Sequence, residues 1–486
     1  MKYRKDHPHS QYPAYLSEGL PSKLSPREFC EKTERSIEYP DAAQFDDKSE
    51  LLKEVISEID WFRFIRQEHY ELFNSVLTML QRTYQWRYPT DPSYVSWMYQ
   101  VAMDPKSAAP QSNAVSDTKV IVGPTGFGKS TMVTHILTST FEQVVCHDKP
   151  DFKDLQIVYL MVRIPHDANR AELIARLLFQ MDTLIAQHGG PQMNYAARVK
   201  TKNGKRIPIA EMINILKTAL VRHHVGLILF DDVQHIEVLK GDELTLMKQL
   251  FDEISNDLKI PHIKVGTPNM LPLFQEYGSN LRRLGRIFEF TRIESPEEIN
   301  ELNSALFNEL EKAVAVESLE EVKEELWFQS AGIPATLFDL LRASIDVAIS
   351  TRKLLSAKLV GETMRKEYPH MLRFVHNIRE KNASRPIDSM TVNEMYQHNR
   401  MNKFKRVRKV LNTHGVKGPA AKDAVAHVEN LIASQSVSHE EKELLKDFAS
   451  ELKAKQLIEN GSQTIEGSIV LDASQNLDGT GAPNEP

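Results

Sequence analysis

A glycine-rich stretch at residues 119–131, KVIVGPTGFGKST, carries residue types that can bind a triphosphate. It matches the spacing G-x-x-x-x-G-K-[ST], in which glycines let successive backbone N–H groups converge on phosphate oxygens. Lys129 would reach the β- and γ-phosphates, and the Ser130 hydroxyl would bind Mg²⁺. The residues predicted to form this phosphate loop are Gly123, Pro124, Thr125, Gly126, Phe127, Gly128, Lys129, Ser130 and Thr131.

Two acids at the end of a second apolar stretch would complete such a site. Residues 225–230, VGLILF, have the pattern of a buried strand and are followed by Asp231 and Asp232. Open α/β sheets bind ligands outside the carboxyl ends of their strands, so Asp231 is predicted to lie beside Ser130 and to hold Mg²⁺. Asp232 would orient or deprotonate the attacking water. These residues predict ATP and Mg²⁺ as cofactors, with Ser130 and Asp231 as metal ligands.

Four further residues are candidates for transition-state contacts. Thr267 follows an expected strand at residues 260–265 and would touch the γ-phosphate or the water. Arg282, Arg283 and Arg286 are placed where they would reach the nucleotide of a neighbouring subunit, as an arginine finger that stabilises transition-state charge. The alternatives are a turn that begins at Thr267 and a solvated helix end at the arginines.

Strand patterns alternate with helical patterns around these residues, and this order predicts a mainly parallel sheet. The expected strands are at residues 120–122, 155–164, 225–230, 260–265 and 287–290. The expected helices run from 130 to about 141, over 171–186 with Asp167 or Asn169 as the cap, and over 209–221. The predicted fold class is α/β, a P-loop core with a five-stranded parallel sheet and helices on both faces, followed by a helical lid.

Shifts in pattern along the chain predict six segments. They are an extended N-terminal arm at 1–45 that orders on a partner or on the body of the protein, a helical extension and linker at 46–118, the nucleotide-binding α/β domain at 119–295, the helical lid at 296–380, a basic then acidic helical region at 381–460, and a disordered tail at 461–486.

The charge of the chain limits how it can meet nucleic acid. A length of 486 residues allows roughly two to four domains. The net charge is -6 and the pI about 6.3, which excludes a globally basic binder, so any nucleic-acid contact must come from local patches. Residues 352–417 hold 16 Lys and Arg against 5 Asp and Glu, whereas residues 418–486 hold 5 against 12.

Cysteine usage and hydropathy suggest a cellular location. The two cysteines, Cys30 and Cys146, share no motif, which fits a reducing cytosol and argues against a disulfide scaffold or a zinc finger. No apolar run approaches the roughly 18 residues of a membrane span. The opening residues, MKYRKDHPHSQYPAY, lack the apolar core of a signal peptide. The expected location is the cytoplasm, with no membrane partner.

A basic stretch at residues 198–206 is the best candidate for DNA contact. Its pattern predicts a loop or hairpin with Asn203-Gly204 as the turn. Its cations would neutralise phosphates without reading bases, so binding to double-stranded DNA would be nearly independent of sequence. The alternative is an exposed hairpin with no partner. The candidate DNA-binding residues are Arg198, Lys200, Lys202, Lys205 and Arg206. A second basic stretch, KFKRVRK at 403–409, falls on a predicted helix.

The motif set resembles one family in particular. A helical lid after a five-stranded nucleotide core is the layout of AAA+ ATPases. The segments GPTGFGKST, LILFDDVQHI, KVGTPNMLPLFQ, LRRLGRIFEF and SAGIPATLFDLLRASI, in this order, resemble the AAA+ regulator of DNA transposition called TnsC and its TniB relatives. Gln234-His235 and the Gly-Thr-Pro turn at 266–268 are the more particular marks. The resemblance covers roughly residues 55–380.

The resemblance implies a function. Such proteins bind ATP, assemble head to tail into rings or filaments around double-stranded DNA, and link a target-selecting protein to the transposase. They release or disassemble on hydrolysis. The family pattern would assign Lys129 and Ser130 to phosphate and Mg²⁺, Asp231 to Mg²⁺ and Thr267 to the sensor position. One of the three arginines would be the finger, and the C-terminal region would dock the transposase.

Two positions depart from the family pattern. Asp232 stands where the family usually has Glu, and its carboxylate is one methylene shorter, which would slow hydrolysis. Ala335 stands where many AAA+ proteins place an arginine after G-x-P, so a direct lid contact to the γ-phosphate is in doubt. Both departures favour a slow switch over a fast motor.

Three other hypotheses compete with a matchmaking ATPase on DNA. A helicase-loading or DNA-stimulated motor ATPase of the AAA+ class would hydrolyse ATP briskly, which Asp232 and Ala335 argue against. A related secretion-type ATPase predicts a membrane span. A STAND-type signalling switch predicts a long repeat array after the lid, and the sequence shows no such repeat.

Overall fold

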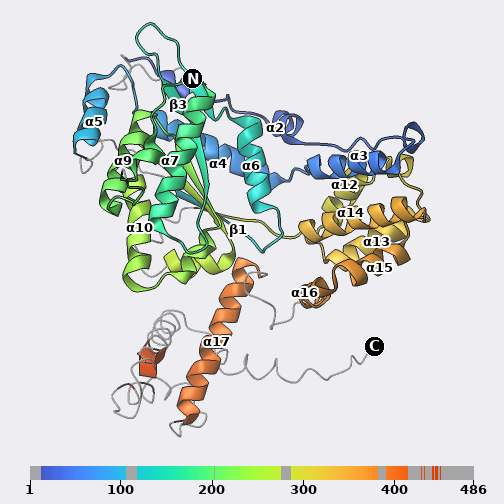
Figure 1. Cartoon of the computed structure of the whole chain (residues 1–486). Coiled ribbons are helices and arrows are strands. Elements are labelled where there is room, and N and C mark those ends of the chain that lie inside the picture. The colour runs from blue at the N-terminus through green and yellow to red at the C-terminus, as the bar shows by residue number, and fades with distance from the viewer. Residues whose placement is uncertain are drawn as a thin grey trace, which may run out of the picture. The chain divides into compact units, whose positions relative to one another are not determined.

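The computed structural model describes residues 12–104, 118–201, 203–274, 286–380 and 390–413, together with isolated positions between 428 and 449. Its contacts divide the chain into two units, Met1–Val392 and Asn393–Pro486. The first unit holds the sheet, the phosphate loop and a bundle of helices that follows them (Figure 1). The predicted arginines at 282 and 283, Lys202 and the tail at 461–486 lie outside the described residues.

A five-stranded parallel sheet forms the centre of the first unit, as predicted. Its strand order is β4-β5-β6-β1-β7, and every neighbouring pair is parallel. Most strand residues are buried, as expected for a parallel sheet covered on both faces. The strands are β1 (Thr118–Val122), β4 (Tyr159–Arg163), β5 (Leu227–Asp231), β6 (His262–Gly266) and β7 (Ile287–Glu289).

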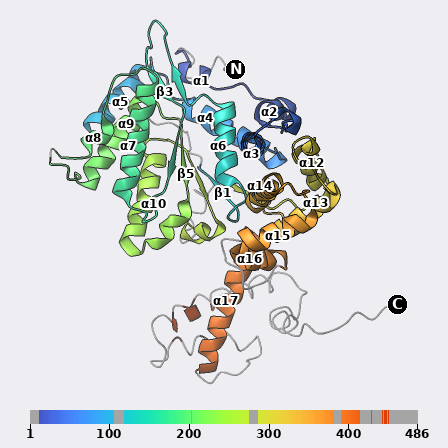
Figure 2. The ribbon, with the colours of Figure 1, turned by 45° about the vertical axis from the view of Figure 1, so that its right-hand side comes forward.

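Helices cover both faces of this sheet (Figure 2). One face is covered by α4 (Gln67–Tyr84) and α6 (Lys129–Thr140), whose apolar residues share a cluster with residues of β1, β5 and β6. The other face is covered by α7 (Arg170–Gln187), α9 (Ile209–Arg222) and α10 (Gly241–Asn256). Three short elements also belong to this part: α8 (Tyr195–Arg198), η2 (Val233–Val238), which follows β5, and η3 (Pro268–Phe274), which follows β6.

The apolar run at 155–164 is two strands and not the single strand predicted. Its first part, β3 (Leu155–Ile157), pairs antiparallel with β2 (Val144–Cys146), whereas its second part is β4 of the main sheet. The two strands are separated by Val158, whose N–H donates to the Gln143 carbonyl at 2.9 Å. Before Val158 the chain pairs with β2, and after it the chain pairs with β5. Continuous apolar character cannot show such a change of pairing partner.

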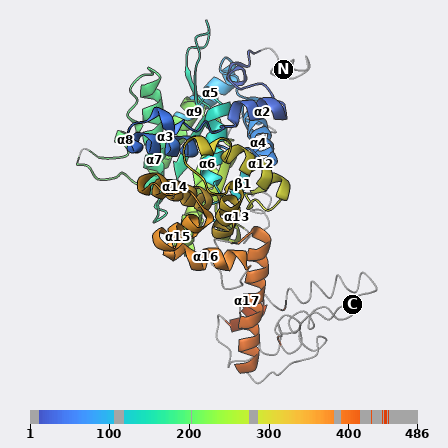
Figure 3. The ribbon, with the colours of Figure 1, turned by 90° about the vertical axis from the view of Figure 1, so that its right-hand side faces the viewer.

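The lid is a bundle of helices that pack on one another (Figure 3). Between α13 and α14 the chain reverses at Ala331 and Gly332, both with positive φ, and Pro334 begins the next helix. The helices bury a separate apolar cluster, here called the lid core, which includes Leu302, Leu326 and Leu341. The lid elements are α12 (Pro296–Leu306), η4 (Leu310–Lys312), α13 (Leu319–Ser330), α14 (Pro334–Thr351), α15 (Ala357–Glu367) and α16 (Pro369–Arg379).

The N-terminal segment lies along both parts of the first unit. Leu16 and Phe29 are fully buried in the cluster beneath α4 and α6, here called the sheet core. Further along, Val55 and Ile59 belong to the lid core, so the predicted helical extension is shared between two apolar clusters. Its elements are α1 (Tyr15–Glu18), α2 (Pro26–Thr33), η1 (Ala42–Gln44), α3 (Lys48–Trp61) and α5 (Pro92–Met103).

The second unit contains most of one long helix, α17 (Val392–Thr413), which includes the basic stretch at 403–409. Its backbone is helical over that stretch, as the sequence predicts.

Candidate nucleotide-binding site

The phosphate loop connects β1 to α6 and depends on three glycines. Gly126 and Gly128 have φ of 85° and 75°, a region that side chains rarely adopt. A Cβ on Gly123 would lie 2.5 Å from the Phe290 carbonyl oxygen, so only glycine fits there. The loop ends at the N-terminus of α6, a twelve-residue helix. The N–H groups and the dipole at a helix N-terminus favour an anion.

Lys129 and Ser130 begin that helix and face the loop and the acid strand. The Lys129 ammonium donates to the Pro124 carbonyl at 2.8 Å, and its side chain is buried. The Ser130 hydroxyl donates to Oδ1 of Asp231 at 2.8 Å, across 101 residues of sequence. The fold thus brings the predicted hydroxyl and carboxylate of the metal site into direct contact.

Asp231 ends β5 in a partly buried position. Burial raises the pKa of this carboxyl group, while the hydrogen bond from Ser130 opposes that shift. A hydroxyl and a carboxylate are oxygen donors that suit Mg²⁺, which usually takes its remaining ligands from water and phosphates. Within the described residues no group of three or more His, Cys, Asp or Glu side chains is arranged to hold a metal ion. A metal bound here would therefore depend on Ser130, Asp231 and the nucleotide itself.

Asp232 follows in a left-handed conformation with φ of 55°. Its Oδ2 lies 2.9 Å from Nε of Arg163, and its Oδ1 accepts a hydrogen bond from the Gln234 amide at 3.1 Å. Arg163 ends β4 and stands in register with Asp231 on the neighbouring strand. Sequence reasoning missed Arg163, and its only signal was a charged residue at the end of an apolar run.

Thr267 comes directly after β6 and is buried. Its N–H donates to Oε1 of Gln234 at 3.3 Å, and its hydroxyl donates to the Asn269 side chain. Gln234 therefore bridges Asp232 and Thr267. A Cβ on Gly266 would come within 2.6 Å of the same Gln234 oxygen, so the glycine lets this bridge form.

Arg286 lies away from the phosphate loop of its own chain. Its carbonyl accepts from the Val120 N–H, on the strand that leads into the loop. Its guanidinium pairs with Glu71 of α4 and lies over the Phe288 ring at 4.6 Å. Arg286 is not among the residues that line the cavity at the phosphate loop, and its role as an arginine finger stays a prediction.

Within the basic stretch at 198–206, Arg198 ends helix α8, whereas the described residues from 199 to 206 form a hairpin-like turn. Lys200 and Arg206 form an antiparallel bridge, and Gly204 takes a positive φ of 76° at the turn. Arg198, Lys200, Lys205 and Arg206 are exposed. Arg206 pairs with Glu172 of α7, and Arg198 lies over the Tyr195 ring, so two of these cations already have neighbours in the chain.

A cavity of about 510 Å³ extends from the phosphate loop toward the lid. Its phosphate end includes Lys129, Ser130 and Asp231, and its far end is lined by Phe62, Arg66, His69 and the lid residue Phe338. Both apolar and charged side chains line this cavity, and its size lies in the range of small-molecule and cofactor sites. The sequence did not predict the far end. Phe62, Arg66 and His69 lie on the N-terminal extension, far along the chain from the phosphate loop, and they match no nucleotide-binding motif.

The lid meets the phosphate loop directly. The Ala335 N–H at the start of α14 donates to the Gly126 carbonyl at 3.0 Å. The short side chain at 335 thus stands against the loop, at the position where many AAA+ proteins place an arginine. Arg342, two turns further along α14, lines the cavity and pairs with Asp60 and Asp339.

These features define the class of fold. The order β4-β5-β6-β1-β7, with the phosphate loop after β1 and the acids after β5, is that of a P-loop AAA+ core with a helical lid. Residues 118–274 match the family model described as AAA domain. No curated protein matches the chain. No helix in the described ranges has both the length and the apolar character to cross a membrane.

Solved structures with similarity to this chain include three proteins. The ORC1 protein of Aeropyrum pernix, in complex with DNA, is 14% identical, with 74% of this chain and 82% of that chain covered and a TM-score of 0.35. Cdc6p of Pyrobaculum aerophilum is 13% identical, with 74% and 78% covered and a TM-score of 0.34. Domain III of the Thermotoga maritima replication initiation protein DnaA is 14% identical, with 59% and 96% covered and a TM-score of 0.30.

Proposed function

We propose that this protein binds and hydrolyses ATP with Mg²⁺, and that it uses the bound state to assemble on DNA. The observation that carries the nucleotide part is the 2.8 Å hydrogen bond between Ser130 and Asp231, beside a buried Lys129. Three groups with complementary chemistry for a metal-bound triphosphate converge there from two separate strand ends. Mg²⁺, when bound by Ser130 and Asp231, would neutralise charge on the phosphates.

The residues around Asp232 would position the attacking water. Its carboxylate stands beside Asp231 and has Gln234 as a neighbour, which in turn contacts the Thr267 backbone. Asp232 would accept or orient a proton of the water, and Thr267 would contact the γ-phosphate or the water. The ion pair with Arg163 engages the Asp232 carboxylate, which supports a slow rate of hydrolysis.

The DNA-dependent part rests on the resemblance to transposition regulators and on the exposed basic hairpin. In this proposal, copies of the chain join head to tail around double-stranded DNA, with an arginine from the 282–286 segment completing the neighbour's site. The assembly would link a target-selecting protein to transposase subunits and would disassemble on hydrolysis. Contacts by Arg198, Lys200, Lys202, Lys205 and Arg206 would be to phosphates, so the assembly would accept any sequence.

Electron microscopy with duplex DNA and a non-hydrolysable ATP analogue tests this function. Rings or filaments are expected with the wild-type protein and none with Lys129→Ala. Calorimetry on the same two proteins should show nucleotide binding that is lost in the variant. Lys153→Ala, which changes an exposed lysine in the turn between β2 and β3, should bind as the wild type does. Monomers on DNA with bound nucleotide would contradict the assembly, and no nucleotide binding would contradict the whole proposal.

Hydrolysis rate separates this proposal from a helicase-loader or DNA-stimulated motor. A switch should turn over ATP well below about one per second, the low end of typical enzymes, with or without DNA. Single-turnover rates well above that value in the presence of DNA would favour the motor.

A further inference from the structure

In the part of the chain that the structure describes, three connections between separate elements lead from the sheet core to the lid core or back. The first joins α2, where Phe29 is in the sheet core, to Ile37 in the lid core. The second joins Phe62 in the lid core to α4, and the third joins Phe290 in the sheet core to Ile293 in the lid core. These three chain segments are here called the hinge, and the N-terminal extension supplies two of them.

Hydrogen bonds tie these segments to one another. Arg35 of the first and Arg63 of the second exchange two backbone bonds, at 3.2 and 3.0 Å. Arg66 of the second donates from Nη1 to the Thr291 carbonyl of the third at 3.0 Å. Any rotation of the lid must therefore move or break hydrogen bonds between the segments, in addition to changing backbone angles within them.

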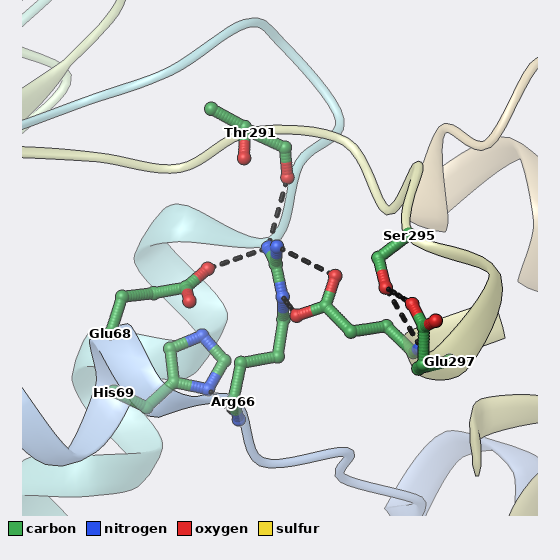
Figure 4. Close-up of polar contacts among 7 residues, drawn as sticks. Arg66, Glu68, His69, Thr291, Ser295 and Glu297 are labelled. Atoms are coloured by element: carbon green, nitrogen blue, oxygen red, sulfur yellow. Dashed lines mark hydrogen bonds and ion pairs between the residues drawn. The ribbon is translucent and has the colours of Figure 1, made fainter.

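Arg66 bridges the two sides of this hinge (Figure 4). Nε and Nη2 donate to the two carboxylate oxygens of Glu298 at 3.1 and 3.3 Å, and Nη1 lies 2.6 Å from Glu68. Glu298 is in the first turn of α12 in the lid, whereas Glu68 is in the first turn of α4 beside the sheet. The Arg66 side chain is only 12% exposed, and its hydrogen bonds to the Glu298 carboxylate join two ionised groups, which makes them stronger than neutral ones.

The backbone at Arg66 is also fixed. Its N–H donates to Nδ1 of His69 at 3.0 Å, and the His69 ring packs on Phe290 with ring centroids 5.3 Å apart. Burial lowers the pKa of His69 to about 3, so the ring is neutral and Nδ1 accepts at physiological pH. Arg66 is thus held on the sheet side while its guanidinium reaches the lid.

The position of the lid matters for the site, because α14 begins on the phosphate loop. Ala335 donates to Gly126, and Ile333 would lie 3.2 Å from a Cβ at Gly126. Arg66 and Thr291 line the same cavity as Lys129 and Ser130. A change in the hydrogen bonds of Arg66 would therefore alter the cover over the phosphate loop.

We infer that Arg66 is a positioning residue that holds the lid, through Glu298 and Thr291, at the angle at which α14 covers the phosphate loop. The effect on nucleotide affinity rests on the proposed function, whereas the effect on the lid angle does not.

The lid angle can be measured without nucleotide. Spin labels on the native exposed Cys146 and on Lys353→Cys at the end of α14, with Cys30→Ser, give a distance between sheet and lid. Wild-type Arg66 should give one narrow distance distribution, and Arg66→Ala a broad or shifted one. Arg27→Ala removes an Arg–Glu pair within α2 that does not cross the hinge, and it should leave the distribution narrow. An unchanged distribution in Arg66→Ala would overturn the inference.

Nucleotide affinity gives the second readout. Arg66→Ala should weaken ATP binding about tenfold, with Arg66→Lys in between because an ammonium cannot make the same paired contact with a carboxylate. Glu298→Gln keeps the size of the side chain and should also weaken ATP binding. This variant tests the same ion pair if Arg66→Ala does not fold. The double variant should be no weaker than Arg66→Ala, since both residues act through one ion pair. Additive reductions in affinity, or unchanged affinities, would contradict the inference.

Failure of the proposed function would look different. If the wild-type protein and Lys129→Ala both bind no ATP while Arg66→Ala still broadens the distances, the nucleotide proposal falls and the role of Arg66 in the hinge remains.

Discussion

Oδ2 of Asp232 lies 2.9 Å from Nε of Arg163, so the carboxylate that we propose to act on water is paired with the last residue of the neighbouring strand. The Arg163 side chain is 68% exposed and the Asp232 side chain 29% exposed, which makes this pair accessible to a bound partner or to DNA. Asp232 is also held in a left-handed backbone conformation, which orients its side chain toward Arg163 and Gln234.

Arg163→Ala should therefore speed hydrolysis by freeing Asp232. The expected change is a several-fold rise in the single-turnover rate without DNA, since an exposed pair contributes about 1 kcal/mol or less. Asp232→Asn should abolish turnover while ATP still binds. A rate that is unchanged or lower in Arg163→Ala would show that the pair assists the reaction or has no part in it.

The basic hairpin should determine how DNA affinity depends on salt. Changing Lys202, Lys205 and Arg206 to Ala together removes three cations, so the slope of log affinity against log salt should flatten by roughly 0.9 for each phosphate that is no longer neutralised. Filter binding or fluorescence anisotropy from low to moderate salt would measure it. The matched control changes three exposed cations of the N-terminal segment, Lys23, Arg27 and Lys32, and should keep the slope. An equal slope in both variants would exclude the hairpin.

Lys264 should make stability rise with pH. It is buried in β6, with Nζ 2.5 Å from Nε2 of His262, and burial lowers its pKa to about 7. The unfolded chain binds this proton up to a pKa near 10.4, so between about pH 7 and 10 it holds more protons than the folded chain. The free energy of unfolding should increase over that range, by at most about 1.4 kcal/mol per pH unit from this group.

Lys264→Met should remove that increase, as measured by urea unfolding at several pH values. His262 and Asp252 are the ionisable groups that act on Lys264: His262 is also buried with a lowered pKa, and the Asp252 carboxylate raises the pKa of the lysine. Lys153→Met, at an exposed position, should keep the wild-type slope. A variant that retains the full increase would place the titrating group elsewhere.

Arg87 should be essential for stability. It is buried, and its guanidinium donates to the carbonyls of Val225, Leu258 and Lys259 at 2.7, 3.1 and 3.1 Å. Arg87→Met would leave these carbonyls without their donor, at about 1–3 kcal/mol for each buried group left unsatisfied. The free energy of unfolding should fall by at least about 3 kcal/mol, whereas Arg82→Met on the exposed side of α4 should change it by less than about 1. If Arg87→Met lowered the free energy of unfolding by less than about 1 kcal/mol, water would be replacing the guanidinium as the donor to these carbonyls.

The sequence by itself determined the sheet, the phosphate loop and the acids after β5. Local pattern carries this information, because a parallel strand buried on both faces is a continuous apolar run, and the loop needs glycine at fixed positions. Alternation of strands and helices then places Ser130 and Asp231 at the same sheet edge, although 101 residues separate them.

Only the tertiary structure decided which residues surround that centre. Arg163 reaches Asp232 because β4 pairs with β5 in one particular register. Arg66 reaches Glu298 because α3 packs on the lid and α4 on the sheet, which brings segments 232 residues apart into contact. Such contacts depend on how apolar faces pack against one another in three dimensions. The residues next to a charged side chain in the sequence do not indicate which distant residue it will contact.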